Sequence, residues 1–143
     1  MPQASVLTSL TAASSYAVPS PFVCTWEQGG SGAAWVHVAG ELDLATAPQL
    51  GQALREARLY ARLVVLDLRE LTFMDSSGVH VILDNARGAR QASGRLILAR
   101  GSSHIDRLLA LTGVCDEVET FELNPTEAPA IAMLHLAQRR VAA

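Results

Sequence analysis

Aromatic residues, long apolar runs and an excess of basic residues are all lacking in this chain of 143 residues. Aromatics make up 5% of a sequence that is 50% hydrophobic, so the core must be built from aliphatic side chains. No apolar stretch approaches the roughly 20 residues that a membrane-spanning helix needs, so we expect no membrane insertion. The net charge of −3 predicts no basic patch, which argues against nucleic acid or anionic lipid as the main partner.

Cysteine is also scarce, since the chain contains only Cys24 and Cys115. Two cysteines so far apart in sequence are too few for a disulfide framework, and no Cys-x-x-Cys motif or Cys/His cluster indicates a zinc site. We therefore expect both to be small apolar side chains in a reducing cytoplasm.

The usual motifs of catalysis and cofactor binding are missing too. No glycine-rich nucleotide-binding loop is present, and no histidine pair has metal-ligand spacing. Ser76, Asp75 and His80 do not make a triad, because the serine lacks a Gly-x-Ser-x-Gly elbow and the adjacent acid cannot orient the histidine. We expect no catalytic residue, no metal and no cofactor. The histidines are His37, His80, His104 and His135.

Residues 1–21 contain no Asp, Glu, Lys or Arg. This segment lacks the positive start and the unbroken apolar centre of a secretory signal. Its Ser/Thr/Ala composition predicts a flexible tail, with a short swapped or docking arm as the alternative. We expect the folded domain to occupy residues 22–143.

Hydrophobic periodicity in residues 22–143 predicts alternating strands and helices. Glycines at 29–32 predict a hairpin whose second strand places Trp35 and His37 on one face and Val36 and Val38 on the other. The predicted strands are 22–27, 33–39, 62–68, 95–99 and 118–121. The predicted helices are 47–60 with Thr46 as N-cap, one starting at Ser76, one at 103–112 with a Ser103–Asp106 capping box and Gly113 after its end, and one starting at Pro125 or Thr126.

This order predicts a single α/β domain with a mostly parallel mixed β-sheet, an N-terminal β-hairpin and about four α-helices. The strand at 62–68 is apolar along almost its whole length. That pattern is typical of a central strand that is buried on both faces.

Two strand–helix junctions carry acids, Asp43 in GELD and Asp75 in FMDSSG. Functional groups of open α/β sheets gather outside the carboxyl ends of the strands, so the acids would flank Ser76 and Ser77 if they share an edge. A helix cap explains residues 75–77 on local grounds. The alternative is phosphorylation, because the helix N-terminus holds a phosphate whose charge of about −1.5 to −2 would repel a partner.

These segments resemble the STAS domain and, more specifically, bacterial anti-sigma factor antagonists. The resemblance rests on GELD with a Thr-x-Pro helix start, RLVVLDL, LTFMDSSGV, RLILA and HIDRLLALTGV, in matching order. It covers residues 22–122, and DSSG is its most specific part.

The resemblance implies a non-enzymatic, cytoplasmic phosphoprotein that regulates bacterial transcription in a stress response. In that family the unphosphorylated antagonist binds an anti-sigma factor, itself a serine kinase, and frees a sigma factor. Phosphorylation breaks the complex, and a serine phosphatase restores it. The phosphorylated residue would be Ser76, with Ser77 as second choice. The partner-binding residues would be Asp43, Asp75, Ser76, Ser77, Gly78 and His80.

His80 departs from the family pattern, which often has a small residue at this place. It lies one helical turn after Ser76, so it would narrow the choice of partner or prevent phosphorylation by the usual kinase. Two other functions stay open: a STAS partner subunit of an ABC-type lipid transporter without a phosphorylation cycle, and a module that senses a small ligand or nucleotide. A weak homodimer also stays open.

Overall fold

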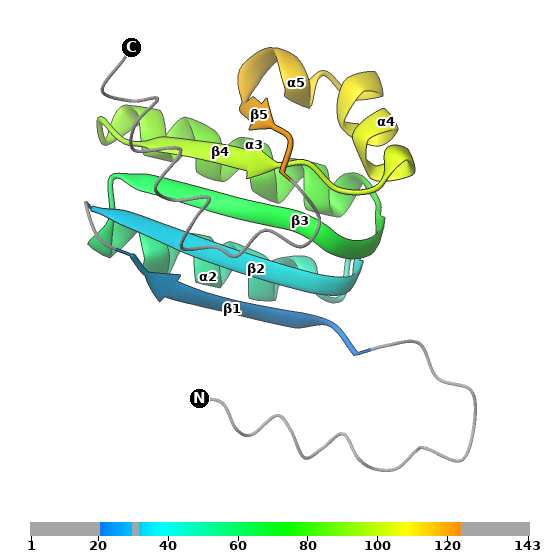
Figure 1. Cartoon of the computed structure of the whole chain (residues 1–143), viewed down its shortest axis with the longest axis horizontal. Coiled ribbons are helices and arrows are strands. Elements are labelled where there is room, and N and C mark those ends of the chain that lie inside the picture. The colour runs from blue at the N-terminus through cyan, green and yellow to red at the C-terminus, as the bar shows by residue number, and fades with distance from the viewer. Residues whose placement is uncertain (1–20, 30–31, 124–143) are drawn as a thin grey trace.

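The computed structural model describes residues 21–29 and 32–123 (Figure 1). Residues 1–20 of the predicted tail, and the helix predicted to start at Pro125 or Thr126, lie outside the described residues. The strands are β1 (Val23–Gln28), β2 (Ala33–Leu42), β3 (Leu63–Met74), β4 (Arg95–Ala99) and β5 (Glu119–Phe121). The helices are α2 (Ala47–Tyr60), α3 (Ser76–Gln91), α4 (Ser103–Leu111) and α5 (Val114–Glu117).

The five strands form one mixed sheet in the order β1-β2-β3-β4-β5. β1 and β2 are antiparallel, which confirms the predicted hairpin. β2, β3, β4 and β5 are mutually parallel along this order, with helical crossovers between them. The prediction of a mostly parallel α/β sheet is confirmed.

β3 is the central strand, and residues 63–68 are all buried, as their nearly continuous apolar pattern predicted; the charged residue among them, Asp67, is buried as well. Both β2 and β3 run further than expected, to Leu42 and Met74. The strand predicted to end at residue 39 continues through Gly40, which adopts a φ of +94° inside β2, next to a register shift between β2 and β3. Only a residue without Cβ adopts this φ at little cost. Gly40 therefore allows the register shift, and β2 continues beyond it.

The helices cover one face of the sheet, where Val36 and Val38 pack with side chains from α2, α3, α4 and α5 (Figure 1). Trp35 is buried in a separate cluster on the opposite face, as the predicted alternation requires. None of the helices in the described ranges is long and apolar enough to cross a membrane.

Two details of the predicted helix ends are wrong. The capping box does not form, because α4 begins one residue earlier than its pattern requires, with Ser102 as N-cap and no side-chain cap bond. The short helix α5 was not predicted at all, since four residues carry too little periodicity to detect. Gly113 does follow the end of α4 with a φ of +82°, which agrees with the prediction.

Candidate phosphoacceptor and partner-binding site

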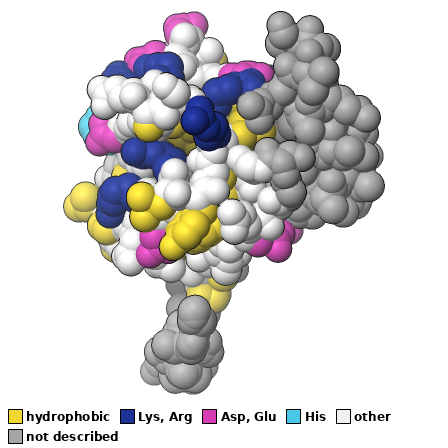
Figure 2. Space-filling model, turned by 90° about the vertical axis from the view of Figure 1, so that its left-hand side faces the viewer, with side chains coloured by type: hydrophobic (Ala, Val, Ile, Leu, Met, Phe, Trp, Pro, Cys, Tyr) yellow, Lys and Arg dark blue, Asp and Glu magenta, His cyan; other side chains and the backbone are white. Residues whose placement is uncertain are grey.

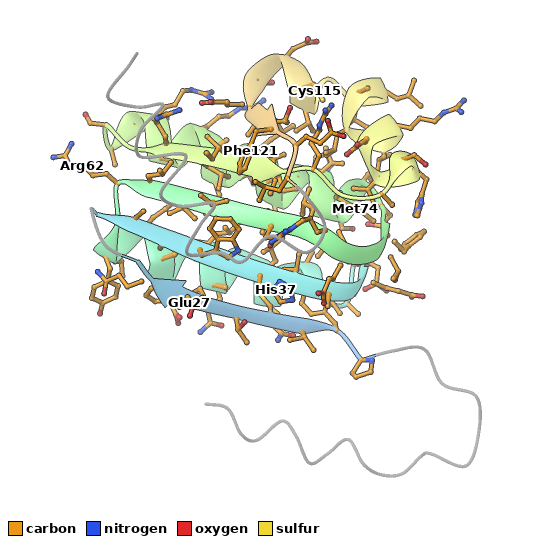
Figure 3. All side chains as sticks on the ribbon, in the orientation of Figure 1. Glu27, His37, Arg62, Met74, Cys115 and Phe121 are labelled. Carbon is orange, nitrogen blue, oxygen red and sulfur yellow. The ribbon has the colours of Figure 1, made fainter. Side chains whose placement is uncertain are left out.

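The two acidic junctions lie at the same edge of the sheet. Leu42 and Met74 are register partners at the carboxyl ends of the parallel strands β2 and β3, and Asp43 and Asp75 are the next residues. The Asp75 N–H also donates to the Leu42 carbonyl at 3.1 Å. Figure 3 shows Met74 at this end of the sheet. The sheet therefore brings together segments that are about thirty residues apart in sequence.

Asp75 is the N-cap of α3. Its backbone is extended, with φ −115° and ψ −170°, and its Oδ1 accepts a hydrogen bond of 2.8 Å from the Ser77 N–H. Its carbonyl accepts the N–H groups of Gly78 and Val79 at 3.1 and 3.3 Å. The cap that local pattern predicted is therefore present, and it uses one of the free N–H groups of the first turn.

Ser76 is the first residue of α3, and it is exposed, whereas Ser77 is half-buried. Within the described ranges, the hydroxyl of neither serine is hydrogen-bonded to another group. Ser76 is therefore the more accessible of the two hydroxyls at the positive end of the helix dipole.

Gly78 faces the sheet and is buried. A Cβ at this position would lie 2.6 Å from Leu42 Cδ2 and 2.8 Å from Met74 Cγ. The absence of a side chain thus lets the first turn of α3 pack directly on the register pair that ends β2 and β3. This contact fixes the height of Ser76 above the sheet edge.

Asp43 is half-buried and holds its own loop together. Its Oδ1 accepts from the N–H groups of Ala45 and Thr46 at 3.0 and 3.1 Å, while its N–H donates to Thr46 Oγ1 at 2.9 Å. Thr46 occupies the N-cap position of α2, but its side chain makes no cap bond, because the hydroxyl donates to the Glu41 carbonyl at 2.9 Å instead. The predicted capping role of the Thr46 side chain is wrong; it closes the loop that carries Asp43.

His80 lies on the exposed side of α3, one turn beyond Ser76. Sequence reasoning missed two apolar neighbours in the same junctions: Leu44, which is 77% exposed, and Phe73, which is 43% exposed. It also missed His104, whose Nε2 lies 2.9 Å from the Thr72 carbonyl and so brings the start of α4 to this edge. Phe73 was detectable, because it alternates with buried Met74 once β3 is extended this far.

The assembled edge presents one exposed hydroxyl on a fixed helix start, with two carboxylates and two apolar side chains in the adjoining segments. Among the described residues, no three His, Cys, Asp or Glu side chains are grouped so that they could hold a metal ion. The arrangement suits modification of a serine and contact with another protein.

The STAS domain profile matches residues 28–130 of this chain. The chain is 35% identical over 85 residues to the anti-sigma-B factor antagonist of Listeria monocytogenes, which covers 59% of this chain and 75% of that protein. It is 35% identical over 81 residues to the anti-sigma F factor antagonist of Paenibacillus polymyxa, covering 55% and 69% of the two chains.

Solved structures show the same fold. The unphosphorylated anti-sigma factor antagonist SpoIIAA superposes with a TM-score of 0.67 at 20% identity, covering 81% of this chain and 97% of that one. An anti-sigma factor antagonist from Mycobacterium paratuberculosis gives a TM-score of 0.68 at 23% identity, covering 84% and 99%. The chain belongs to the STAS domain family, in the group of the anti-sigma factor antagonists.

Proposed function

We propose that this protein is an anti-sigma factor antagonist that acts in the bacterial cytoplasm by binding rather than by catalysis. Its unphosphorylated form binds an anti-sigma factor with serine kinase activity and releases a sigma factor. Phosphorylation of Ser76 ends this binding, and a serine phosphatase restores it. The observation that carries the proposal is the exposed Ser76 hydroxyl on the first residue of α3.

The helix start supports a switch that leaves the fold intact. A phosphate on Ser76 lies at the positive end of the α3 dipole, which favours an anion by about 0.3–1 kcal/mol. It adds about −1.5 to −2 charges directly beside Asp75. The Asp75 cap and the Gly78 contact with the sheet are made by other atoms, so they persist. The change is therefore confined to the charge of the surface that the partner meets.

The partner surface in this proposal comprises the helix start and its apolar neighbours. Leu44 and Phe73 expose apolar area next to the two acidic junctions. Apolar groups beside charged ones are the usual composition of an interface core and its rim. His80 is the proposed selective contact, because its exposed ring lies one turn from the phosphoacceptor.

The named relatives support this function. Antagonists of anti-sigma-B and anti-sigma F factors are found among the similar proteins, and Bacillus SpoIIAA has been solved in a phosphorylated as well as an unphosphorylated form. In this chain the Asp-Ser-Ser-Gly segment begins α3, with Asp75 as the capping acid and Ser76 as the exposed serine that follows it.

The test is phosphopeptide mapping of the protein from its own cells across growth and stress conditions. It is combined with phosphorylation and binding assays using each anti-sigma serine kinase of the same genome. We expect phosphate on Ser76, no phosphorylation of Ser76→Ala, and normal phosphorylation of the matched control Ser77→Ala. Ser76→Ala should bind the anti-sigma factor constitutively, and Ser76→Asp should bind it at least about tenfold more weakly.

Phosphate on Ser77 instead of Ser76 would move the site by one residue. The absence of phosphate under every condition, with full peptide coverage, would refute the switch and favour an unphosphorylated partner subunit. Unchanged binding of Ser76→Asp would refute the electrostatic explanation.

A further inference from the structure

A second polar site lies at the opposite end of the sheet from Ser76. Figure 3 shows Arg62, just before β3, at the far end from Met74. Here an open pocket of about 470 Å³ is lined by Arg55, Arg58 and Arg62, and by the apolar side chains of Leu59 and Ala92 among others. Figure 2 shows this side of the molecule, where dark blue arginine side chains lie among apolar and uncharged ones, with some acidic side chains on the same side.

The three arginines of this pocket have no acidic partner in the described part of the chain. Several other arginines of the described residues are paired, Arg87 with Glu117, Arg95 with Glu119 and Arg100 with Glu122. No such ion pair is formed within residues 21–29 and 32–123 by Arg55, Arg58 or Arg62. Like charges around one depression repel each other, and a bound anion would relieve this repulsion.

Arg58 is held in a defined position by α3. Its Nη1 donates to Asn85 Oδ1 at 2.7 Å, and Asn85 is only 4% exposed and is itself fixed by donating to the Val81 carbonyl at 3.0 Å. A Cβ at Gly88 would lie 2.7 Å from Arg58 Nη2 and 2.9 Å from its Cζ. Gly88 therefore leaves the space that this guanidinium occupies, although glycine costs a helix interior about 1 kcal/mol relative to alanine.

The other two arginines are supported as well. The backbone of Arg62 is hydrogen-bonded on both sides, its N–H to the Gly32 carbonyl at 3.1 Å and its carbonyl to the Arg95 N–H at 2.7 Å. The Arg55 guanidinium passes close to Gly51 of its own helix, where a Cβ would lie 3.2 Å from Nη1. Two helix-interior glycines thus adjoin two of the three guanidinium groups.

We propose that this arginine pocket, formed by Arg55, Arg58 and Arg62, binds a small soluble molecule that carries phosphate groups. Guanidinium groups match phosphate oxygens with paired, charge-assisted hydrogen bonds. The volume falls within the range of about 300–1,000 Å³ that is usual for small-molecule sites. The expectation of no basic patch is wrong here, because a net charge of −3 for the whole chain conceals a local cluster.

The helix ends alone do not account for the cluster. α2 and α3 both end at this pocket, and a cation near each carboxyl end is favourable. That need is met by one basic residue in the last turn of each helix, Arg58 in α2 and Arg90 in α3. Arg55 and Arg62 are additional to it, and the packing at Gly88 serves orientation rather than charge.

The experiment titrates pyrophosphate into the full-length protein by calorimetry at constant ionic strength. We expect saturable binding to the wild type, reduced about tenfold or more in Arg58→Gln and Arg62→Gln. The matched control is Arg107→Gln, which removes the same charge from an exposed residue of α4 that has no ion pair among the described residues. Its affinity should stay within about twofold of the wild type.

The Gly88→Ala variant tests the arginine pocket without changing its charge. We expect it to weaken pyrophosphate binding, because the new methyl group displaces the Arg58 guanidinium. Ser76→Ala should bind pyrophosphate normally, so this proposal stands or falls separately from the phosphoswitch. No saturable binding at about 10 mM pyrophosphate, or an equal loss in Arg107→Gln, would overturn it. Sedimentation with phosphatidylglycerol vesicles but no pyrophosphate binding would also overturn it, in favour of a membrane surface.

Discussion

The backbone N–H of Asp75 donates to the carbonyl oxygen of Leu42 at 3.1 Å, one residue beyond the last register pair of β2 and β3. This bond continues the ladder between the two strands into their loops. As a result, the loop that carries Asp43 and the helix start that carries Ser76 form one rigid edge. Under the proposed function, a partner meets two segments that are already hydrogen-bonded to each other, so less conformational entropy is lost in ordering them.

Two substitutions of Asp75 distinguish the contribution of its cap hydrogen bond from that of its charge. Asp75→Ala loses the bond to the Ser77 N–H and should lower the free energy of unfolding by about 1 kcal/mol. Asp75→Asn caps a helix equally well, so it should stay within about 0.5 kcal/mol of the wild type. Urea denaturation at pH 7 measures both. A similar loss in the two variants would show that the charge, and not the cap bond, is the stabilising feature.

Gly78 and Gly88 form a matched pair within α3. Gly78→Ala gains about 1 kcal/mol of helix propensity but overpacks Leu42 and Met74, which costs about 1–3 kcal/mol, so we expect a net loss of about 1 kcal/mol. Gly88→Ala gains the same propensity and displaces only the end of Arg58, so its stability should be within about 1 kcal/mol of the wild type. Equal stability of the two variants would contradict the close packing at Gly78.

Asp67 should make the protein less stable in acid. Burial raises the pKa of this carboxyl, but hydrogen bonds and charge from Arg69, with a further bond from Trp35, outweigh burial and hold the pKa below its usual range. Between the two pKa values the unfolded chain binds more protons than the folded one. The stabilisation is therefore complete above the unfolded value of about 3.9 and is lost as pH falls through the folded value.

Asp67→Asn tests this dependence. Urea unfolding of both proteins at several pH values from 7 down to about 3 should show a smaller decrease in the variant, because an asparagine side chain is not protonated in this range. Parallel curves for the two proteins would mean that Asp67 does not contribute to the acid sensitivity.

The two cysteines should react at very different rates. Burial and then the nearby charge of Glu56 raise the pKa of the Cys24 thiol to about 12, whereas Cys115 is exposed. Alkylating reagents attack the thiolate, and the raised pKa leaves very little of the Cys24 thiol in this form at pH 8. Iodoacetamide should therefore modify Cys115 first in the folded protein and both residues in urea, as followed by mass spectrometry. Equal rates in the folded protein would contradict the burial of Cys24.

His80 should affect partner choice and not stability. His80→Ala keeps good helix propensity at an exposed position, so we expect the free energy of unfolding to change by less than about 0.5 kcal/mol. If the ring selects the kinase, the variant should be phosphorylated by kinases that reject the wild type. An identical kinase profile for the two proteins would remove this role.

The order of strands and helices was predictable because periodicity is a local property. The apolar run at 63–68, interrupted only by Asp67, identified the central strand, and the change of period at Ser76 identified α3. The extension of β3 to Met74 was not predictable in this way, because it depends on pairing with β2, which passes through Gly40 at a positive φ. Pairing between distant segments leaves no local pattern.

The candidate site was predictable in its residues but not in its geometry. The acids and serines were identified from two junctions, yet only the register of Leu42 with Met74 places them on one edge. The arginine pocket has only a partial sequence signal: Arg55 and Arg58 are three residues apart in α2, but Arg62 lies beyond the end of this helix, so helical spacing does not place it beside them. Net charge concealed it, because the acidic residues that balance these arginines lie elsewhere.

The packing of Gly78 on Leu42 and Met74 determines where this surface can diversify. The position that faces the sheet accepts no larger side chain without moving the helix, whereas Ser77 and His80 are not enclosed in this way. If this surface binds the partner as proposed, new partner preferences can arise at the outward positions while the support beneath them stays the same. Within this fold, recognition can evolve independently of stability.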